Sequence, residues 1–168
     1  MPSCVLLDVN GTLTDLGPLG APWGRPELGS VVLDHAVRTA MVETLTGAAT
    51  RPFSDHIRAA VEVVVAEAKL DTGRVDDAVE AAASLPARAD AAEALALLAA
   101  AGSRLFALTN SGARAGQATL EAAGLATHVQ RVLGVDAVAR FKPHPAVYAY
   151  ALRELDASAT EVTLIALA

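Results

Sequence analysis

The most constraining feature of the sequence is a short apolar run near its start that stops at a carboxylate. The run covers Ser3 to Leu7, Asp8 follows it, and Gly11 comes three residues later. An apolar run of this length is typical of a strand buried on both faces of a parallel sheet. Asp8 then stands at the carboxyl end of the strand, where open α/β sheets bind ligands. Gly11 allows a tight turn, and the Thr12 hydroxyl can bond to a group in the crevice.

The sequence after residue 86 alternates between apolar runs and segments with helical periodicity. With the first run included, we expect strands over 3–7, 104–108, 129–135 and 162–166, and helices over 91–101, 113–123 and 145–155. Alternation of strands and helices predicts a parallel sheet covered by helices. The expected fold class is therefore α/β, with a Rossmann-like parallel sheet.

The segment between the first strand and residue 87 has a different pattern. Residues 16–26 are rich in Pro and Gly and predict a linker, whereas helical spacing follows over 34–47, 54–68 and 75–84. A crossover between neighbouring parallel strands usually contains one helix, so three helices indicate an insertion. We expect a core formed by residues 1–15 and 87–168 and an inserted helical cap over 16–86.

Composition narrows the classes of partner. Thirteen Lys and Arg against nineteen Asp and Glu give a net charge of −6, which argues against nucleic acid. No apolar run is long enough to span a membrane, and no signal segment precedes the first strand. Cys4 is the single cysteine, which excludes a disulfide framework and favours a reducing, cytoplasmic location.

Histidine spacing gives no sign of a metal centre. The four histidines, His35, His56, His128 and His144, lack the spacing of metal ligands. We therefore expect them to lie on the surface or to cap helices. Together with the single cysteine, this pattern predicts no metal site.

Two further positions could carry chemistry beside Asp8. Thr109 ends the second expected strand and precedes Asn110 and a helix, so its hydroxyl and the free helix amides could face an anion. Lys142 precedes Pro143 in the loop before the last helix, where proline restricts the backbone and could fix the direction of the ammonium. Each position also has a structural interpretation, because Thr109 could cap a helix and Lys142 could be a solvated charge.

Taken together and in this order, these motifs resemble those of the haloacid dehalogenase superfamily. The segment D-x-x-G-T-L-x-D runs from Asp8 to Asp15, a hydroxyl ends the second strand, and Lys142-Pro143 is followed at K-P-x-x-x-x-Y spacing by Tyr148. This last spacing is similar to that of the type II (S)-2-haloacid dehalogenase branch. A helical insertion soon after the first motif also matches that branch.

The resemblance implies an aspartate nucleophile and a small anionic substrate such as a 2-haloacid. Asp8 would displace halide and form an aspartyl ester, which water then hydrolyses. The ammonium of Lys142 would keep Asp8 ionised, with a gross attraction of about 4 kcal/mol at 4 Å. Thr109 would hold the substrate carboxylate. Asn10, Thr12, Asn110 and Tyr148 would bind substrate or support these groups, and no cofactor is implied.

Two departures from the family pattern keep other functions open. Magnesium-dependent phosphatases of the superfamily carry D-x-D at the first motif, and Asn10 replaces the second acid here. An amide cannot exchange a proton at neutral pH, so a phosphatase using Mg²⁺ is the second candidate. The dehalogenase branch usually has Tyr where this chain has Asn10. Its halide-binding Arg aligns near Leu33, with neither Arg25 nor Arg38 in register.

The end of the chain gives a third alternative. The chain stops after Leu164-Ile165-Ala166-Leu167-Ala168, where the family would place an Asp-containing fourth motif. We expect a C-terminally truncated core, and an inactive relic or binding protein stays open. The strand over 162–166 should be an edge strand, which favours association. We therefore expect the 168-residue chain to be oligomeric, with a homodimer as one form, or poorly soluble, with little turnover.

Overall fold

The computed structural model describes residues 4–47 and 50–167. Its strands are β1 (Cys4–Leu7), β2 (Arg104–Thr109), β3 (Arg131–Gly134) and β4 (Val162–Ile165). Its α-helices are α1 (Leu28–Thr46), α2 (Phe53–Glu67), α3 (Val75–Ala81), α4 (Ala91–Ala100), α5 (Ala113–Ala122) and α6 (Pro145–Leu155). The predicted alternation after residue 86 is confirmed, with strand ends shifted by one or two residues. Ser3, part of the first predicted strand, lies outside the described residues.

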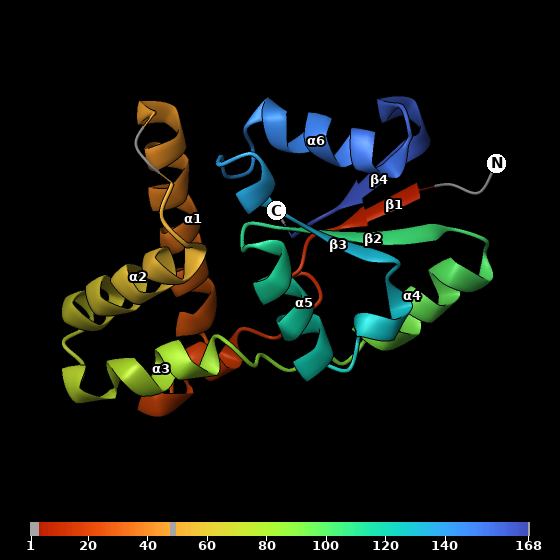
Figure 1. Cartoon of the computed structure of the whole chain (residues 1–168). Helices are drawn as coiled ribbons and strands as arrows, with labels where there is room; N and C mark the ends of the chain where they lie inside the picture. The colour runs from red at the N-terminus through yellow and green to blue at the C-terminus, as the bar shows by residue number, and fades with distance from the viewer. Residues whose placement is uncertain (1–3, 48–49, 168) are drawn as a thin grey trace.

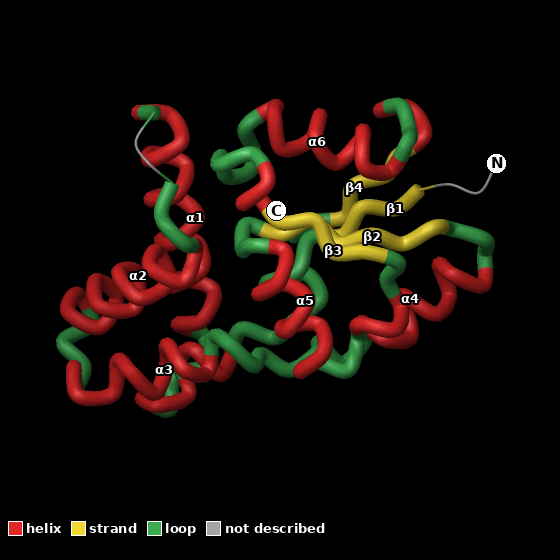
Figure 2. Tube along the Cα trace, in the orientation of Figure 1, coloured by secondary structure: helices red, strands yellow, loops and turns green. Residues whose placement is uncertain are grey.

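The four strands form one parallel sheet in the order β3-β2-β1-β4 (Figures 1 and 2). This arrangement confirms the predicted Rossmann-like α/β fold. Strand β1 lies inside the sheet, next to β2. Because the two strands are parallel, their carboxyl ends lie side by side at the same end of the sheet. Strand β4 is an edge strand, as predicted, and its Leu164 and Ile165 are exposed.

Side chains of β1 alternate between two apolar layers because successive strand residues point to opposite faces. Cys4 and Leu6 pack in the layer that contains residues of α6. Val5 and Leu7 pack in the other layer, with residues of α4 and α5. Helix α6 thus covers one face of the sheet and helices α4 and α5 cover the other (Figure 1). Burial on both faces explains why the run lacks polar alternation.

Helices α1, α2 and α3 pack on one another beside the sheet (Figures 1 and 2). We call residues 16–86 the insert. The chain enters and leaves it side by side, because the Asp15 N–H donates to the Pro86 carbonyl over 2.8 Å and Thr14 pairs antiparallel with Ala87. We propose that the boundary between core and insert lies at this pair of segments. One apolar cluster nevertheless extends from the insert to the α6 face of the sheet.

The insert differs from the prediction at its start. Short 3-10 turns cover Gly17–Leu19 and Ala21–Trp23, where a linker without regular structure was predicted. A proline stands in the first turn of each, a position that needs no N–H donor. Helix α1 begins at Leu28, six residues before the predicted start. The missed turn is explained by tertiary packing, because Leu28 and Val32 are buried in the core.

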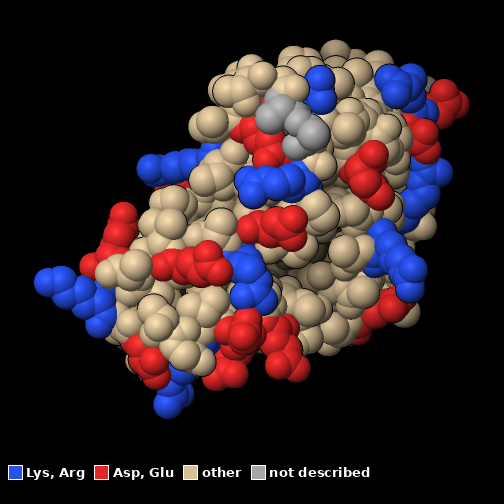
Figure 3. Space-filling model, turned by 60° about the vertical axis from the view of Figure 1, so that its left-hand side comes forward, with Lys and Arg blue, Asp and Glu red and all other residues tan. Residues whose placement is uncertain are grey.

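The surface is mixed in charge. Figure 3 shows the side of the molecule that carries the insert, where Lys and Arg side chains are interspersed with Asp and Glu. Among the helices of residues 4–47 and 50–167, none combines the length and apolar character that a membrane crossing requires.

Candidate active site

Asp8, at the carboxyl end of β1, lies close to Lys142 in the loop between β3 and α6, although 134 residues separate the two in the chain. The Lys142 ammonium lies 2.5 Å from Asp8 Oδ1 and donates to the Leu108 carbonyl over 2.9 Å. Both side chains are largely shielded, with 21% of Asp8 and 14% of Lys142 exposed. Water therefore screens this ion pair less than it would screen a surface pair. A carboxylate and an ammonium face each other at the sheet edge where ligands bind in such folds.

The second oxygen of Asp8 is held by the turn that follows it. Thr12 Oγ1 donates to Asp8 Oδ2 over 3.2 Å and accepts the Leu167 N–H over 2.8 Å. Gly11 allows this turn because its φ of +82° lies in the left-handed region that favours glycine. Both oxygens of the carboxylate thus have a donor, which fixes its orientation.

The loop that carries Lys142 is anchored by both the core and the insert. Asn110 Oδ1 accepts the Lys142 backbone N–H over 2.9 Å. From the insert, Thr44 Oγ1 accepts the Phe141 N–H over 3.0 Å, and Thr50 donates to the Ala139 carbonyl over 2.7 Å. Sequence reasoning placed Asn110 in the site but gave no sign that it holds the lysine backbone. These three bonds restrict where the ammonium can lie.

Thr109 is buried at the end of β2 and lines the same cleft as Asp8. Its Oγ1 accepts the Ser111 N–H over 3.1 Å in the turn before α5, but the N-cap of that helix is Gly112, so Thr109 does not cap it. The hydroxyl proton stays available for a ligand. The amides at the start of α5 are less available than expected, because the Ala113 N–H donates to Asp136 Oδ1.

Tyr148 and Asn10 line the cleft without the contacts that the resemblance implied. Among the described residues, no hydrogen bond joins the Tyr148 hydroxyl to Lys142, so the expected support of the lysine is not formed. Burial raises the pKa of Tyr148, and the nearby Asp8 charge raises it further. The phenol therefore stays protonated at neutral pH and can donate a hydrogen bond to a ligand. Asn10 lines two neighbouring clefts.

These clefts lie between the sheet edge and the insert. The smaller has a volume of about 600 Å³ and contains Asp8, Thr109, Lys142 and Tyr148 in its wall. The larger has a volume of about 780 Å³ and is lined by α2, α3 and α5. Leu33, which aligns near the family's arginine, lines both. Arg25 and Arg38 pair instead with Glu27 and Asp34 on the surface.

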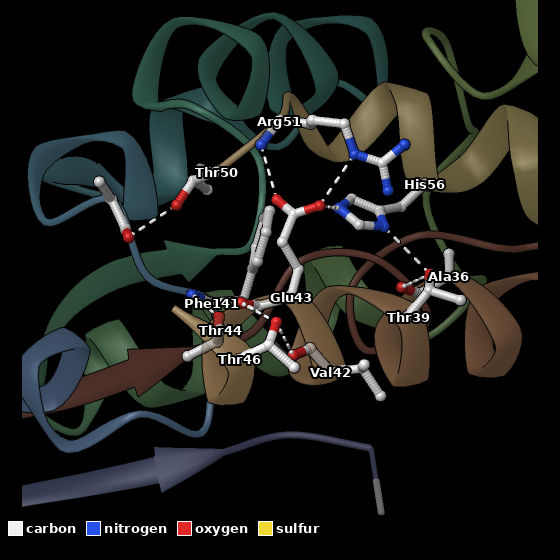
Figure 4. Close-up of polar contacts among 11 residues, drawn as sticks. Ala36, Thr39, Val42, Glu43, Thr44, Thr46, Thr50, Arg51, His56 and Phe141 are labelled. Atoms are coloured by element: carbon white, nitrogen blue, oxygen red, sulfur yellow. Dashed lines mark hydrogen bonds and ion pairs between the residues drawn. The ribbon is translucent and has the colours of Figure 1, made fainter. Parts of the chain in front are cut away.

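A buried polar cluster in the insert was missed by sequence reasoning (Figure 4). Glu43 Oε1 accepts the Arg51 backbone N–H over 2.7 Å, and Glu43 Oε2 accepts Arg51 Nε over 2.8 Å. His56 Nε2 lies 3.4 Å from the same Oε2, and His56 Nδ1 lies 3.0 Å from Thr39 Oγ1. His56 is fully buried, so the expectation that it lies on the surface is wrong. The cluster supports the lysine loop because the His56 ring packs edge-on against Phe141.

The pKa values of both titratable groups in this cluster, Glu43 and His56, are lowered. Burial alone would raise the pKa of Glu43, but the hydrogen bonds from Arg51 outweigh it and lower that pKa. Burial lowers the pKa of His56 despite the nearby Glu43 carboxylate. The cluster therefore holds an ionised glutamate and a neutral histidine at pH 7. Its partners come from two helices and the loop between them, which no local sequence pattern reveals.

Metal ligands are sparse around this site. Within residues 4–47 and 50–167, no group of three or more His, Cys, Asp or Glu side chains is arranged to hold a metal ion. The groups that meet at Asp8 are an ammonium, hydroxyls and amides.

Comparison with known proteins decides the family. The profile of the haloacid dehalogenase-like hydrolases matches residues 2–165. The chain belongs to this family. No match was found among curated protein sequences.

Solved structures resemble this haloacid dehalogenase-like hydrolase over almost its whole length. The L-2-haloacid dehalogenase from Xanthobacter autotrophicus with chloropropionic acid covalently bound is 28% identical, with a TM-score of 0.83 over 98% of this chain and 69% of that one. The L-2-haloacid dehalogenase RSc1362 is 26% identical, with a TM-score of 0.85 over 97% of this chain and 77% of that one. A predicted phosphoglycolate phosphatase from Haemophilus somnus shares the fold at 18% identity and a TM-score of 0.60, over 97% of this chain and 76% of that one.

Proposed function

We propose that this hydrolase cleaves the carbon–halogen bond of (S)-2-haloacids, with Asp8 as the nucleophile. The observation that carries the proposal is the contact between Asp8 and Lys142 in a cleft that also contains Thr109. An ionised carboxylate with a fixed orientation is suited to attack an electrophilic carbon. Two relatives above 25% identity are L-2-haloacid dehalogenases, and one of them holds chloropropionic acid covalently.

The first step forms an ester. An Asp8 oxygen attacks C2 of the substrate, and the bond from C2 to the halogen breaks, with its electron pair leaving on the halide. The Lys142 ammonium donates to Asp8 Oδ1 and holds the carboxylate in place before attack. The Thr109 hydroxyl donates to the substrate carboxylate, and the protonated Tyr148 offers a second donor in the same cleft.

The second step hydrolyses the ester. Water attacks the carbonyl carbon of the Asp8 ester, and the bond to the alcohol oxygen breaks. The products are a 2-hydroxyacid, a regenerated Asp8 carboxylate and one proton. Lys142 stabilises negative charge on the Asp8 carbonyl oxygen as the tetrahedral intermediate forms.

A magnesium-dependent phosphatase is the second candidate because it would use the same nucleophile. It is less well supported, since Asn10 stands two residues after Asp8 and its amide cannot protonate a leaving alkoxide. The structural likeness to a phosphatase concerns the fold alone.

Ester formation is the sharpest test, because it needs only the groups around Asp8. After incubation with (S)-2-chloropropionate, we expect one halide per chain in a first turnover and an adduct on Asp8 in the peptide mass spectrum. Asp8→Asn should abolish both, since an amide is a far poorer nucleophile. Asp15→Asn, which changes an exposed acid nearby, is the matched control and should react normally.

Three other outcomes would contradict the dehalogenase proposal. Magnesium-dependent phosphate release from aryl phosphates, lost in Asp8→Asn, would establish the phosphatase. An adduct on a residue other than Asp8 would assign a different nucleophile. If the chain released neither halide nor phosphate, a role as a binding protein would be favoured instead.

A further inference from the structure

The larger cleft adjoins the reacting site, and the proposed chemistry makes no use of it. Its volume is about 780 Å³. A 2-haloacid with six heavy atoms takes the space of about six water molecules, roughly 180 Å³. The smaller cleft, at about 600 Å³, already exceeds that need. The site is therefore much larger than a three-carbon acid requires.

The two clefts are neighbours and share part of their lining. The residues that line both are Asn10, Leu16, Leu33, Phe53 and Asn110. Asn10 lies two residues from the proposed nucleophile, so the larger cleft is next to the site where C2 of the substrate would react. A substituent on C2 that passes Asn10 would enter the larger cleft.

The wall of the larger cleft is mainly apolar. Helices α2 and α3 form one side and α5 forms the other (Figure 1). Its apolar side chains include Leu19, Ile57, Val79, Leu85, Val135 and Phe141. Small residues stand on both sides, with Ala83 after α3 and Ala118 on α5. Such a wall favours a hydrocarbon group over water.

The charges in this wall do not favour a second anion. Arg51 is bonded to Glu43, and Arg114 shares the wall with the carboxylate of Asp136. Each arginine is therefore balanced by an acid on or next to the wall. This balance argues for an uncharged tail rather than a second carboxylate.

We propose that the larger cleft binds an apolar substituent on C2, so that the preferred substrates are 2-haloacids with a medium-length alkyl tail. This inference rests on the proposed function, because it assigns the tail of the same substrate. Burial of each additional methylene lowers the free energy of the bound state, and several methylenes fit in the cleft.

The test compares 2-bromopropionate with 2-bromooctanoate. We expect the apparent second-order rate constant of first-turnover halide release to be at least about tenfold higher for the octanoate than for the propionate. Ala83→Phe and Ala118→Phe, which fill the cleft from opposite walls, should remove that preference and leave the propionate rate within about twofold. Ala122→Phe, on the same helix as Ala118 but outside the wall, is the matched control and should change neither rate.

A second measurement separates failure of the tail site from failure of the chemistry. Calorimetry with octanoate, which carries no halogen, should show binding that weakens in Ala83→Phe and Ala118→Phe. Octanoate binding without halide release from either acid would refute the dehalogenase and retain the tail site. Equal rates for the two acids, a faster propionate, equal loss of both rates in the Phe variants, or no octanoate binding would overturn the tail site.

Discussion

Lys142 contacts three residues from two segments of the chain, one after β1 and one at the end of β2, through two of its groups. Its ammonium meets Asp8 and the Leu108 carbonyl, while its backbone N–H is held by Asn110. The buried amide fixes the loop, and the ammonium then has little freedom in where it points. The bond to the backbone fixes the loop and the bonds to the ammonium fix the side chain, so a flexible lysine contacts one carboxylate oxygen reproducibly.

At the residue scale, we predict that Lys142→Gln slows ester formation with (S)-2-chloropropionate by about 10²-fold or more. The change removes the positive charge beside Asp8 and the donor that holds its Oδ1, so the carboxylate loses its ion-pair partner and its fixed orientation. The chain has one other lysine, Lys69, which is exposed. Lys69→Gln is thus a matched control and should retain the full rate. An unchanged rate in Lys142→Gln would show that Asp8 needs no cation.

The sequence predicts some of these residues better than others. Asp8 and Lys142 are predictable because each follows a strand of one parallel sheet, and carboxyl ends of such strands meet. The bond from Asn110 to the Lys142 backbone is not predictable, since it depends on the path of a loop 32 residues away. His56 was misplaced for the same reason, because its partner Glu43 lies on another helix.

At the element scale, the junction of β3 and α5 depends on one glycine. A Cβ on Gly134 would lie 2.0 Å from the Ala113 nitrogen, which is backbone and cannot move alone. We predict that Gly134→Ala lowers the free energy of unfolding by about 1–3 kcal/mol, measured in urea. Gly17→Ala is the control, because its Cβ would meet no atom closer than 3.4 Å. Equal stability of the two variants would contradict this packing.

The buried cluster between α1 and α2 should make stability depend on pH. The pKa of His56 is lowered below its ordinary 6.5 in the folded state, so the unfolded chain binds the proton first as pH falls. Stability is therefore complete above pH 6.5 and decreases below it. The lowered pKa of Glu43 acts in the same direction, with a further loss as pH falls below its ordinary 4.5.

This dependence can be followed as the thermal midpoint against pH. We predict that His56→Gln removes the decrease that begins near pH 6.5, because the titrating group is gone. His128→Gln, at a partly exposed histidine, should retain it. A wild-type midpoint that is constant between pH 7 and pH 5 would contradict the neutral, buried state of His56.

At the scale of the whole molecule, the outer edge of β4 presents exposed Leu164 and Ile165. Unpaired backbone groups beside apolar side chains promote association. We predict that the 168-residue chain shows concentration-dependent association by sedimentation velocity. Ile165→Lys should shift the distribution toward monomer, since a charge blocks edge pairing. Leu97→Lys, at an exposed leucine of α4, should have no such effect. Wild-type chain that sediments as a monomer at every concentration would overturn this prediction.

The sequence predicts most of the overall architecture. Continuous apolar runs that alternate with helical segments predict a parallel sheet. In such a sheet helices cover both faces, so both faces of each strand are apolar. The start of α1 was not predictable, since residues 28–33, which follow the Pro- and Gly-rich segment, become helical through the tertiary burial of Leu28 and Val32. Long periodic segments are thus predicted reliably, and their ends depend on packing.

The bonds from Thr44 and Thr50 to the loop at Ala139 and Phe141 have a consequence for protein engineering. A chimera that receives only residues 16–86 from a relative would lose these partners, and the lysine would be displaced with the loop. Residues 139–142 should therefore be exchanged together with the insert, as one module. The insert is continuous in the sequence, but the module that should be exchanged consists of two separate segments, 16–86 and 139–142.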